Sequence, residues 1–140
     1  MNKRILCLDV GDVRIGVAVS DPTRTIATPV EVIRRVGWGP DARRVKALCD
    51  QYDTDEVLSG LPLNMDGTEQ EMTGRARNFG LKISKQFGVK LALEDERLTS
   101  ASAKEEIFAQ GGFKALSSDK GRIDSLAAVT ILEQYFSEHV

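Results

Sequence analysis

The sequence lacks any apolar run long enough to cross a membrane. Its 140 residues contain no uninterrupted apolar stretch of the roughly 18 residues that a spanning helix needs. The chain starts Met1-Asn2-Lys3-Arg4 and passes directly into a short apolar segment, without the longer hydrophobic region of a secretory signal. We therefore expect a cytoplasmic protein that has no membrane partner.

Cysteine and aromatic residues are also scarce. Cys7 and Cys49 are the two cysteines, and they form neither a CxxC pair nor a cluster with histidine, so we expect buried thiols rather than a cysteine metal site. Aromatic residues make up 6% of the chain, whereas 41% of it is hydrophobic. This length and composition predict one domain spanning residues 1–140 with one continuous core.

The chain has no excess of positive charge. Its 19 Lys and Arg residues face 21 Asp and Glu residues, for a net charge of -2, which excludes a general electrostatic attraction to nucleic acid. Local basic clusters can still bind phosphate, although each cluster taken alone also fits a solvated helix face or strand end. The clusters are Lys3-Arg4, Arg34-Arg35, Arg43-Arg44-Lys46 and Arg75-Arg77.

Hydrophobic periodicity and turn residues predict an α/β fold. Three strands, at residues 3–10, 14–20 and 27–36, are joined by short turns, which favours an antiparallel meander. An amphipathic helix follows Pro40, and later strands are predicted at residues 56–59 and 89–93. These elements imply a mixed five-stranded sheet with helices packed on it.

Three helices are predicted in the second half of the chain. One begins at Thr68, where Thr68 and Glu71 match a capping box, and it ends at Gly88. A second follows Glu96, with Thr99 or Ser100 as its cap. The third covers about residues 122–137.

Acidic residues stand at the ends of two predicted strands and on the last predicted helix. Asp9 closes an apolar run, and Glu96 follows the fifth predicted strand. Asp124 shares a helix face with Ala128 and Ile131, which must pack on the sheet. Burying an ionised acid costs several kcal/mol unless a cation or another partner compensates for the lost hydration. One bound cation could compensate for all three acids if the fold brings them together.

Three converging carboxylates suit a hard cation such as Mg²⁺ or Mn²⁺. Two such ions activate water and stabilise the leaving oxygen in phosphodiester hydrolysis. Plain structural roles also fit, because Asp9 precedes a turn and Glu96 has a neighbouring cation in Arg97. Asp124 likewise suits the first turn of a helix. The residue pattern alone leaves a nuclease as one option among several.

Five blocks of sequence carry recognisable motifs over nearly the whole chain. They are residues 8–11, 14–21, 60–68, 95–100 and 124–128. The most specific is the block at 60–68, Gly-Leu-Pro-Leu-Asn-Met-Asp-Gly-Thr. Together these blocks resemble the YqgF/RuvX family, which is related to the RuvC Holliday junction resolvases and to the ribonuclease H fold.

The resemblance implies a ribonuclease H-like fold, with helices on both faces of the sheet. It implies that Asp9, Glu96 and Asp124 are the catalytic, metal-binding acids, with Mg²⁺ or Mn²⁺ as cofactor. The implied function is maturation of the 5′ end of 16S ribosomal RNA from its precursor, with precursor rRNA or ribosomal particles as partners. An older interpretation makes the family a Holliday junction resolvase acting on branched DNA, which favours a homodimer over a monomer.

Two positions depart from the related patterns. RuvC-type resolvases carry a further acid one helical turn before the last Asp, and Gly121 stands there in this chain. A second metal is then held by fewer ligands. Asp12 occupies a position that is usually small and polar in the family, which adds negative charge beside the predicted site.

Four polar residues are candidates for contact with the substrate. Arg14 and Arg97 lie near the acids in sequence and suit phosphate, with a structural ion pair as the alternative for each. Asn64 and Thr68 lie before a predicted helix N-terminus, where backbone N–H groups bind phosphate. A tight turn is the alternative explanation for that loop.

Two other functions compete with a nuclease. A catalytically silent RNA-binding module for ribosome assembly would keep the fold, but three carboxylates would repel the phosphates that it must bind. Asp9-Val10-Gly11 also resembles the first phosphate loop of actin-like ATPases. Those enzymes need two facing domains, which this length does not provide.

Overall fold

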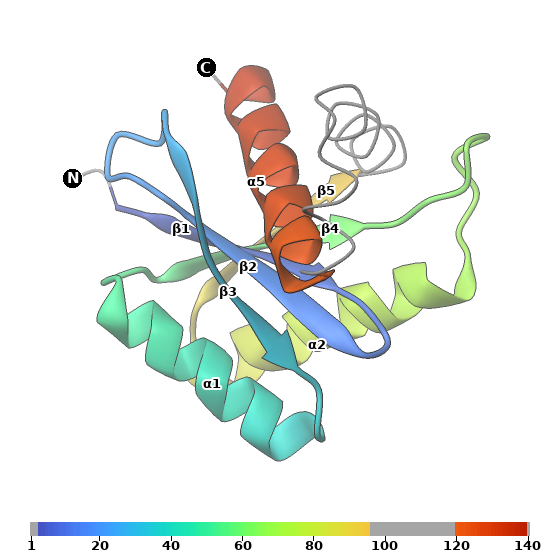
Figure 1. Ribbon diagram of the computed structural model, residues 1–140, viewed down its shortest axis with the longest axis horizontal. Helices are drawn as coiled ribbons and strands as arrows, with labels where there is room; N and C mark the ends of the chain where they lie inside the picture. The colour runs from blue at the N-terminus through green and yellow to red at the C-terminus, as the bar shows by residue number, and fades with distance from the viewer. Residues whose placement is uncertain (1–2, 96–119, 140) are drawn as a thin grey trace.

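The computed structural model describes residues 3–95 and 120–139, with side chains from residue 126 onward in the last helix. Figure 1 shows a sheet with helices on two sides. The strands are β1 (Ile5–Val10), β2 (Arg14–Ser20), β3 (Ala27–Arg34), β4 (Glu56–Leu61) and β5 (Lys90–Asp95). The helices are α1 (Trp38–Gln51), α2 (Glu71–Phe87) and α5 (Lys120–Glu138). The helix predicted after Glu96 lies outside the described residues.

The five strands form one mixed sheet in the order β3-β2-β1-β4-β5. β1, β2 and β3 are antiparallel neighbours, whereas β4 runs parallel to both β1 and β5. The predicted meander followed by alternating helix and strand is therefore confirmed. Because β1, β4 and β5 are parallel, their carboxyl ends lie at one edge of the sheet.

Alternating residues of β1 supply the two halves of the core. Leu6, Leu8 and Val10 join the cluster beneath α1 and α2, and Ile5 and Cys7 join the cluster beneath α5. This period of two is what a strand buried on both faces requires. Helices cover both faces of the sheet, as predicted (Figure 1).

Contacts with α1 and α2 hold the tight β1–β2 hairpin in place. Gly11 N–H donates to the Arg14 carbonyl at 2.8 Å, and a Cβ at Gly11 would lie 2.9 Å from that oxygen, so this turn needs glycine. Asp12 forms a 2.6 Å ion pair with Arg75 of α2. Arg35 donates to the Gly11 carbonyl at 3.0 Å and pairs with buried Asp41 of α1 at 3.5 Å. The end of β1 is thereby held in place.

The start of α2 differs from the prediction. The helix begins at Glu71 with Gln70 as its N-cap residue, and Gln70 N–H donates to Thr73 Oγ1 at 3.1 Å. Thr68 instead belongs to the preceding loop, because its N–H and hydroxyl both donate to Asp66 Oδ1, at 2.9 and 2.6 Å. The Thr68–Glu71 capping box was wrong, since Asp66 takes up the Thr68 hydrogen bonds.

Cys7 and Cys49 are both buried, as predicted. Burial raises the pKa of the Cys49 thiol to about 11, which keeps it protonated and unreactive at neutral pH. Within residues 3–95 and 120–139, no helix is both long and apolar enough to span the bilayer.

Candidate active site

Asp9 lies near the carboxyl end of β1, on the face covered by α5. It follows Cys7 by two residues, and Cys7 packs beneath α5, so strand alternation places Asp9 on the same face. Its cross-strand partner on β2 is Gly16, which has no side chain. Asp9 is therefore half-buried near the end of β1, between the buried residues Leu8 and Val10 and opposite a residue without a side chain.

α5 brings a second predicted acid to this face. The helix contacts β1, β2 and β3, and its buried residues Ala128, Ile131 and Leu132 pack on the cluster that contains Cys7. Position 124 lies one helical turn before Ala128, and residues four apart share a helix face. The backbone therefore places position 124 on the sheet side of α5.

The third predicted acid follows β5. Asp95 is the last residue of that strand, and the next two residues, Glu96 and Arg97, lie outside the described residues. Within residues 3–95 and 120–139, no group of three or more His, Cys, Asp or Glu side chains is arranged to hold a metal. The structure thus places Asp9 and position 124 on the face covered by α5, and β5 ends at the same edge of the sheet as β1. The meeting of the three carboxylates stays a prediction.

Glu94 is an acid on this face that the sequence pattern did not single out. Only 5% of it is exposed, and it accepts a hydrogen bond from Gln134 Nε2 of α5 at 3.1 Å. Burial raises its pKa to about 7, with further contributions from Glu138, whereas Gln134 and His139 oppose the shift. Strand alternation could have indicated that Glu94 lies on this face, because it follows by two residues Ala92, which packs beneath α5.

Exchanging Glu94 for Gln is expected to raise the free energy of unfolding at pH 8 by about 2 kcal/mol. The folded-state pKa, about 7, lies above the 4.5 of an exposed glutamate, so the folded protein binds this proton more tightly than the unfolded chain. The resulting stability is full below pH 4.5 and declines as the pH rises to about 7. Urea unfolding at pH 5 and pH 8 in EDTA measures the difference.

The control for this exchange is Glu133→Gln, at an exposed position of α5. It should change the free energy of unfolding by less than about 0.5 kcal/mol, as exposed surface substitutions usually do. Equal pH dependence in Glu94→Gln and wild type would show that Glu94 carries no perturbed proton.

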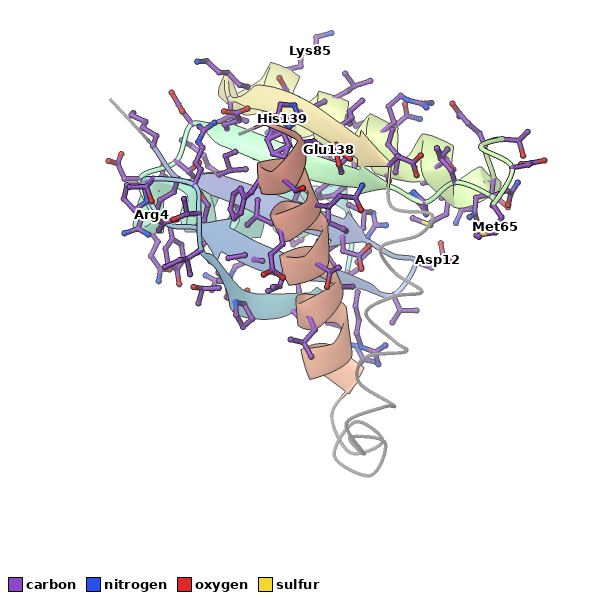
Figure 2. All side chains as sticks on the ribbon, turned by 90° about the horizontal axis from the view of Figure 1, so that it is seen from above. Arg4, Asp12, Met65, Lys85, Glu138 and His139 are labelled. Atoms are coloured by element: carbon purple, nitrogen blue, oxygen red, sulfur yellow. The ribbon has the colours of Figure 1, made fainter. Side chains whose placement is uncertain are left out.

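The predicted substrate loop projects from the sheet edge as a closed turn. Asn64 Nδ2 donates to Thr68 Oγ1 at 3.0 Å, and Asn64 N–H donates to the Thr68 carbonyl at 2.9 Å. Figure 2 shows Met65 at the tip of this loop, at the same end of the molecule as Asp12. Asn64 and Thr68 shape the turn, which presents its tip beyond the carboxyl end of β1, and their contact with substrate stays a prediction.

Two further residues that the sequence singled out, Asp12 and Arg14, have different surroundings in the structure. Asp12 does not stand alone beside the site, because its carboxylate pairs with Arg75. Arg14 begins β2, two residues from Gly16, and therefore lies on the same face as Asp9. Its cross-strand partner is Arg34, which the sequence pattern identified only as one member of a basic cluster.

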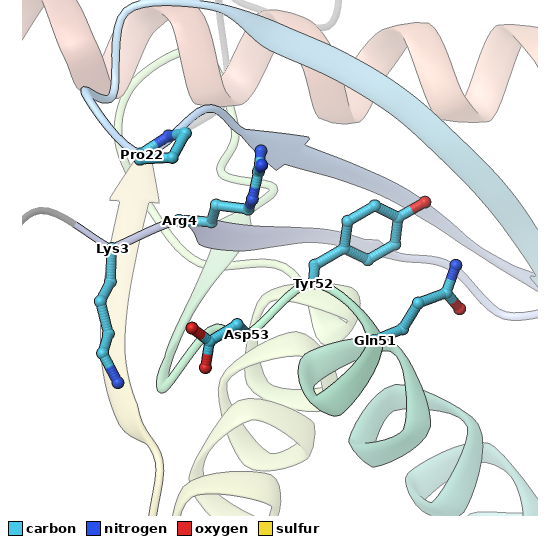
Figure 3. A pocket seen from close by; sticks show the side chains of 6 residues that line it. All are labelled: Lys3, Arg4, Pro22, Gln51, Tyr52 and Asp53. Carbon is cyan, nitrogen blue, oxygen red and sulfur yellow. The ribbon is translucent and has the colours of Figure 1, made fainter.

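A cavity of about 340 Å³ lies at the opposite end of β1 (Figure 3). It is lined by Lys3, Arg4, Pro22, Gln51, Tyr52 and Asp53. Lys3 and Arg4 precede β1 and Pro22 follows β2, so this cavity is separated from Asp9 by the length of the strand. No described residue of the predicted site lines it.

The chain resembles known proteins over nearly its full length. Residues 3–138 match the family model described as RuvX, Holliday junction resolvase. A protein of Shewanella oneidensis is 46% identical over 137 residues, which cover 98% of this chain and 96% of that protein. One of Cronobacter sakazakii is 42% identical over 139 residues, with 99% of each chain covered. Both are named, provisionally, as pre-16S rRNA nucleases.

Solved structures share the same architecture at low sequence identity. Thermus thermophilus RuvC, in complex with a Holliday junction substrate, matches with a TM-score of 0.64 at 16% identity, covering 98% of this chain and 95% of that chain. The fowlpox virus Holliday junction resolvase matches with a TM-score of 0.58 at 12% identity, covering 98% and 99%. At such identities the likeness establishes the fold, and the predicted ribonuclease H-like fold is confirmed.

Proposed function

Because the chain belongs to the RuvX family of Holliday junction resolvases, we propose that it is a metal-dependent endonuclease that processes the 5′ end of precursor 16S rRNA. The observation that carries this proposal is the similarity, at 42% to 46% identity over nearly the whole chain, to relatives named as pre-16S rRNA nucleases. The position of Asp9 supports it, at the carboxyl end of a central strand and beside a glycine. The reaction would occur in the cytoplasm, on precursor rRNA or on assembling ribosomal particles.

Asp9, Glu96 and Asp124 would hold the metal, which we propose to be Mg²⁺ or Mn²⁺. The half-buried Asp9 carboxylate is a hard oxygen donor, the type that these ions prefer. When bound, such an ion makes water a nucleophile at neutral pH and stabilises the charge on the leaving oxygen. The cation would also offset the cost of keeping several carboxylates close together.

The chain's own residues would bind and orient the RNA. Arg14, on the same face as Asp9, would donate hydrogen bonds to a phosphate next to the scissile bond. Asn64 and Thr68 keep the projecting loop closed. Its tip can then contact the RNA strand without the loss of conformational entropy that ordering a flexible loop would cost. Arg97 is the second phosphate contact that we propose.

Removal of divalent metal is expected to lower cleavage at least about 100-fold, since no other group in the proposed mechanism activates water. The substrate is a precursor 16S rRNA fragment that keeps its 5′ leader, and product formation is followed on a gel. The protein is assayed with Mg²⁺, with Mn²⁺ and with EDTA, and metal added after EDTA should restore the rate.

A four-way DNA junction assayed in parallel tests the alternative that the family description raises, a Holliday junction resolvase. Cleavage of the junction but not of the RNA would favour that activity. Tight RNA binding without cleavage in either metal would make the protein a non-catalytic RNA-binding module. Either result would overturn the proposed function.

A further inference from the structure

Two arginines stand directly opposite each other at the edge that carries Asp9. Arg14 of β2 pairs in register with Arg34 of β3. Beyond this pair, Arg35 N–H donates to the Val13 carbonyl at 2.9 Å, so Arg14 and Arg34 form a non-hydrogen-bonded pair of the antiparallel ladder. Such pairs bring their Cα atoms within about 4.5 Å, the closest approach that a sheet allows.

This pairing places two like charges directly opposite each other on neighbouring strands. Opposed like charges destabilise a sheet. Neither Arg14 nor Arg34 forms an ion pair or a side-chain hydrogen bond among the described residues. Five other arginines of the described chain do form ion pairs with acids: Arg24, Arg35, Arg44, Arg75 and Arg77. The two guanidinium groups are therefore available to an external anion.

The pair faces the candidate active site. Gly16 is opposite Asp9 on β1 and opposite Val32 on β3, and Arg14 and Arg34 lie two residues further along the same two strands. Residues two apart share a face, so both arginines project on the side of the sheet that carries Asp9. The spacing along the strand between the Asp9 and Arg14 pairs is about 7 Å.

We propose that Arg14 and Arg34 together bind one backbone phosphate of the nucleic-acid strand, next to the phosphodiester held at Asp9. Two guanidinium forks around one phosphate turn a repulsive pair into a charge-compensated one, with several charge-assisted hydrogen bonds. Because the contact is to the backbone, it orients the strand without reading its sequence. This inference rests on the proposed function and adds Arg34 to it as a binding residue.

Arg34→Gln is expected to weaken binding of a labelled single-stranded RNA about 10-fold, as measured by fluorescence anisotropy without divalent metal. The slope of log affinity against log salt should become shallower by about 0.7, the value for one lost single-strand phosphate contact. The melting temperature should stay unchanged or rise by up to about 3 °C, because the opposed charge is removed. A purely structural arginine would instead lower stability and leave the salt slope intact.

Arg43→Gln is the matched control, because Arg43 is exposed on α1, on the other side of the sheet. It should leave both RNA affinity and melting temperature unchanged. The double variant Arg14→Gln/Arg34→Gln should lose less affinity than the sum of the single losses, since both residues hold the same phosphate. Strictly additive losses would mean two separate contacts and would overturn the shared site.

An Arg34→Gln protein that binds RNA with wild-type affinity and salt slope would overturn the inference while leaving the proposed nuclease intact. Because the binding assay contains no metal, it also gives a result for a protein that does not cleave. Absence of cleavage together with the expected Arg34→Gln binding loss would overturn the nuclease and leave the phosphate site. Wild-type protein that binds no RNA would overturn both.

Discussion

Asp9→Asn is expected to reduce cleavage of precursor 16S rRNA by on the order of 10³-fold. Even the outer hydrogen-bond partners of metal ligands contribute 10- to 100-fold, so a carboxylate that binds the metal itself should contribute more. Asn keeps the shape of Asp but carries no charge, so the exchange removes the charged metal ligand from this half-buried position without changing its volume.

Asp50→Asn provides the comparison for this change. Asp50 lies on α1, where it pairs with Lys46 at 2.9 Å, on the other side of the sheet from Asp9. The same chemical exchange there should leave the cleavage rate unchanged and cost well under 1 kcal/mol, as exposed ion pairs do. Initial rates at saturating Mg²⁺ measure both variants, and an Asp9→Asn protein that cleaves at the wild-type rate would contradict the assignment of Asp9 as a ligand.

Leu132→Ala is expected to lower the free energy of unfolding by about 3 kcal/mol, the typical cost of emptying a buried leucine position. Leu132 is completely buried and packs with Ile5, Cys7 and Leu58 of the sheet. It is therefore part of the contact that docks α5 on the sheet and sets the position of Asp124. We also expect about a 10-fold lower cleavage rate at temperatures well below unfolding, because small displacements of a catalytic group are costly.

Leu81→Ala is the control for packing, since Leu81 is 49% exposed on α2. This exchange should change stability by less than about 0.5 kcal/mol. Urea unfolding followed by circular dichroism measures both variants. If Leu132→Ala were as stable as Leu81→Ala, α5 would not depend on this contact for its position.

Local sequence was sufficient to predict the sheet around Asp9. The alternation from Ile5 to Val10 and the short turns that follow predict adjacent antiparallel strands, because strand period and turn chemistry depend on neighbouring residues. The same signals placed Asp9 at a strand end and Asp124 on the sheet side of the last helix. The boundaries of β3 and α2 shifted by a few residues, since side chains such as Asp66 compete for the backbone groups at an element's end.

Long-range pairings decided the remaining features. Register between β2 and β3 sets Arg34 against Arg14, although each arginine taken alone resembles an ordinary solvated residue. Packing against α5 buries Glu94 and raises its pKa to about 7, and α2 supplies the Arg75 partner of Asp12. These contacts join residues far apart in the chain, so no local pattern encodes them.

By itself, the sequence determined the α/β class, the order of strands and helices, the carboxylate at the end of β1 and the resemblance to a nuclease family. These depend on hydrophobic period, turn residues and motifs, all of which act over a few neighbouring positions. The tertiary structure alone decided which charges meet across strands and which acid is buried beneath α5. Strand register and helix docking control those outcomes, because charge repulsion and desolvation depend on distances that only the folded chain defines.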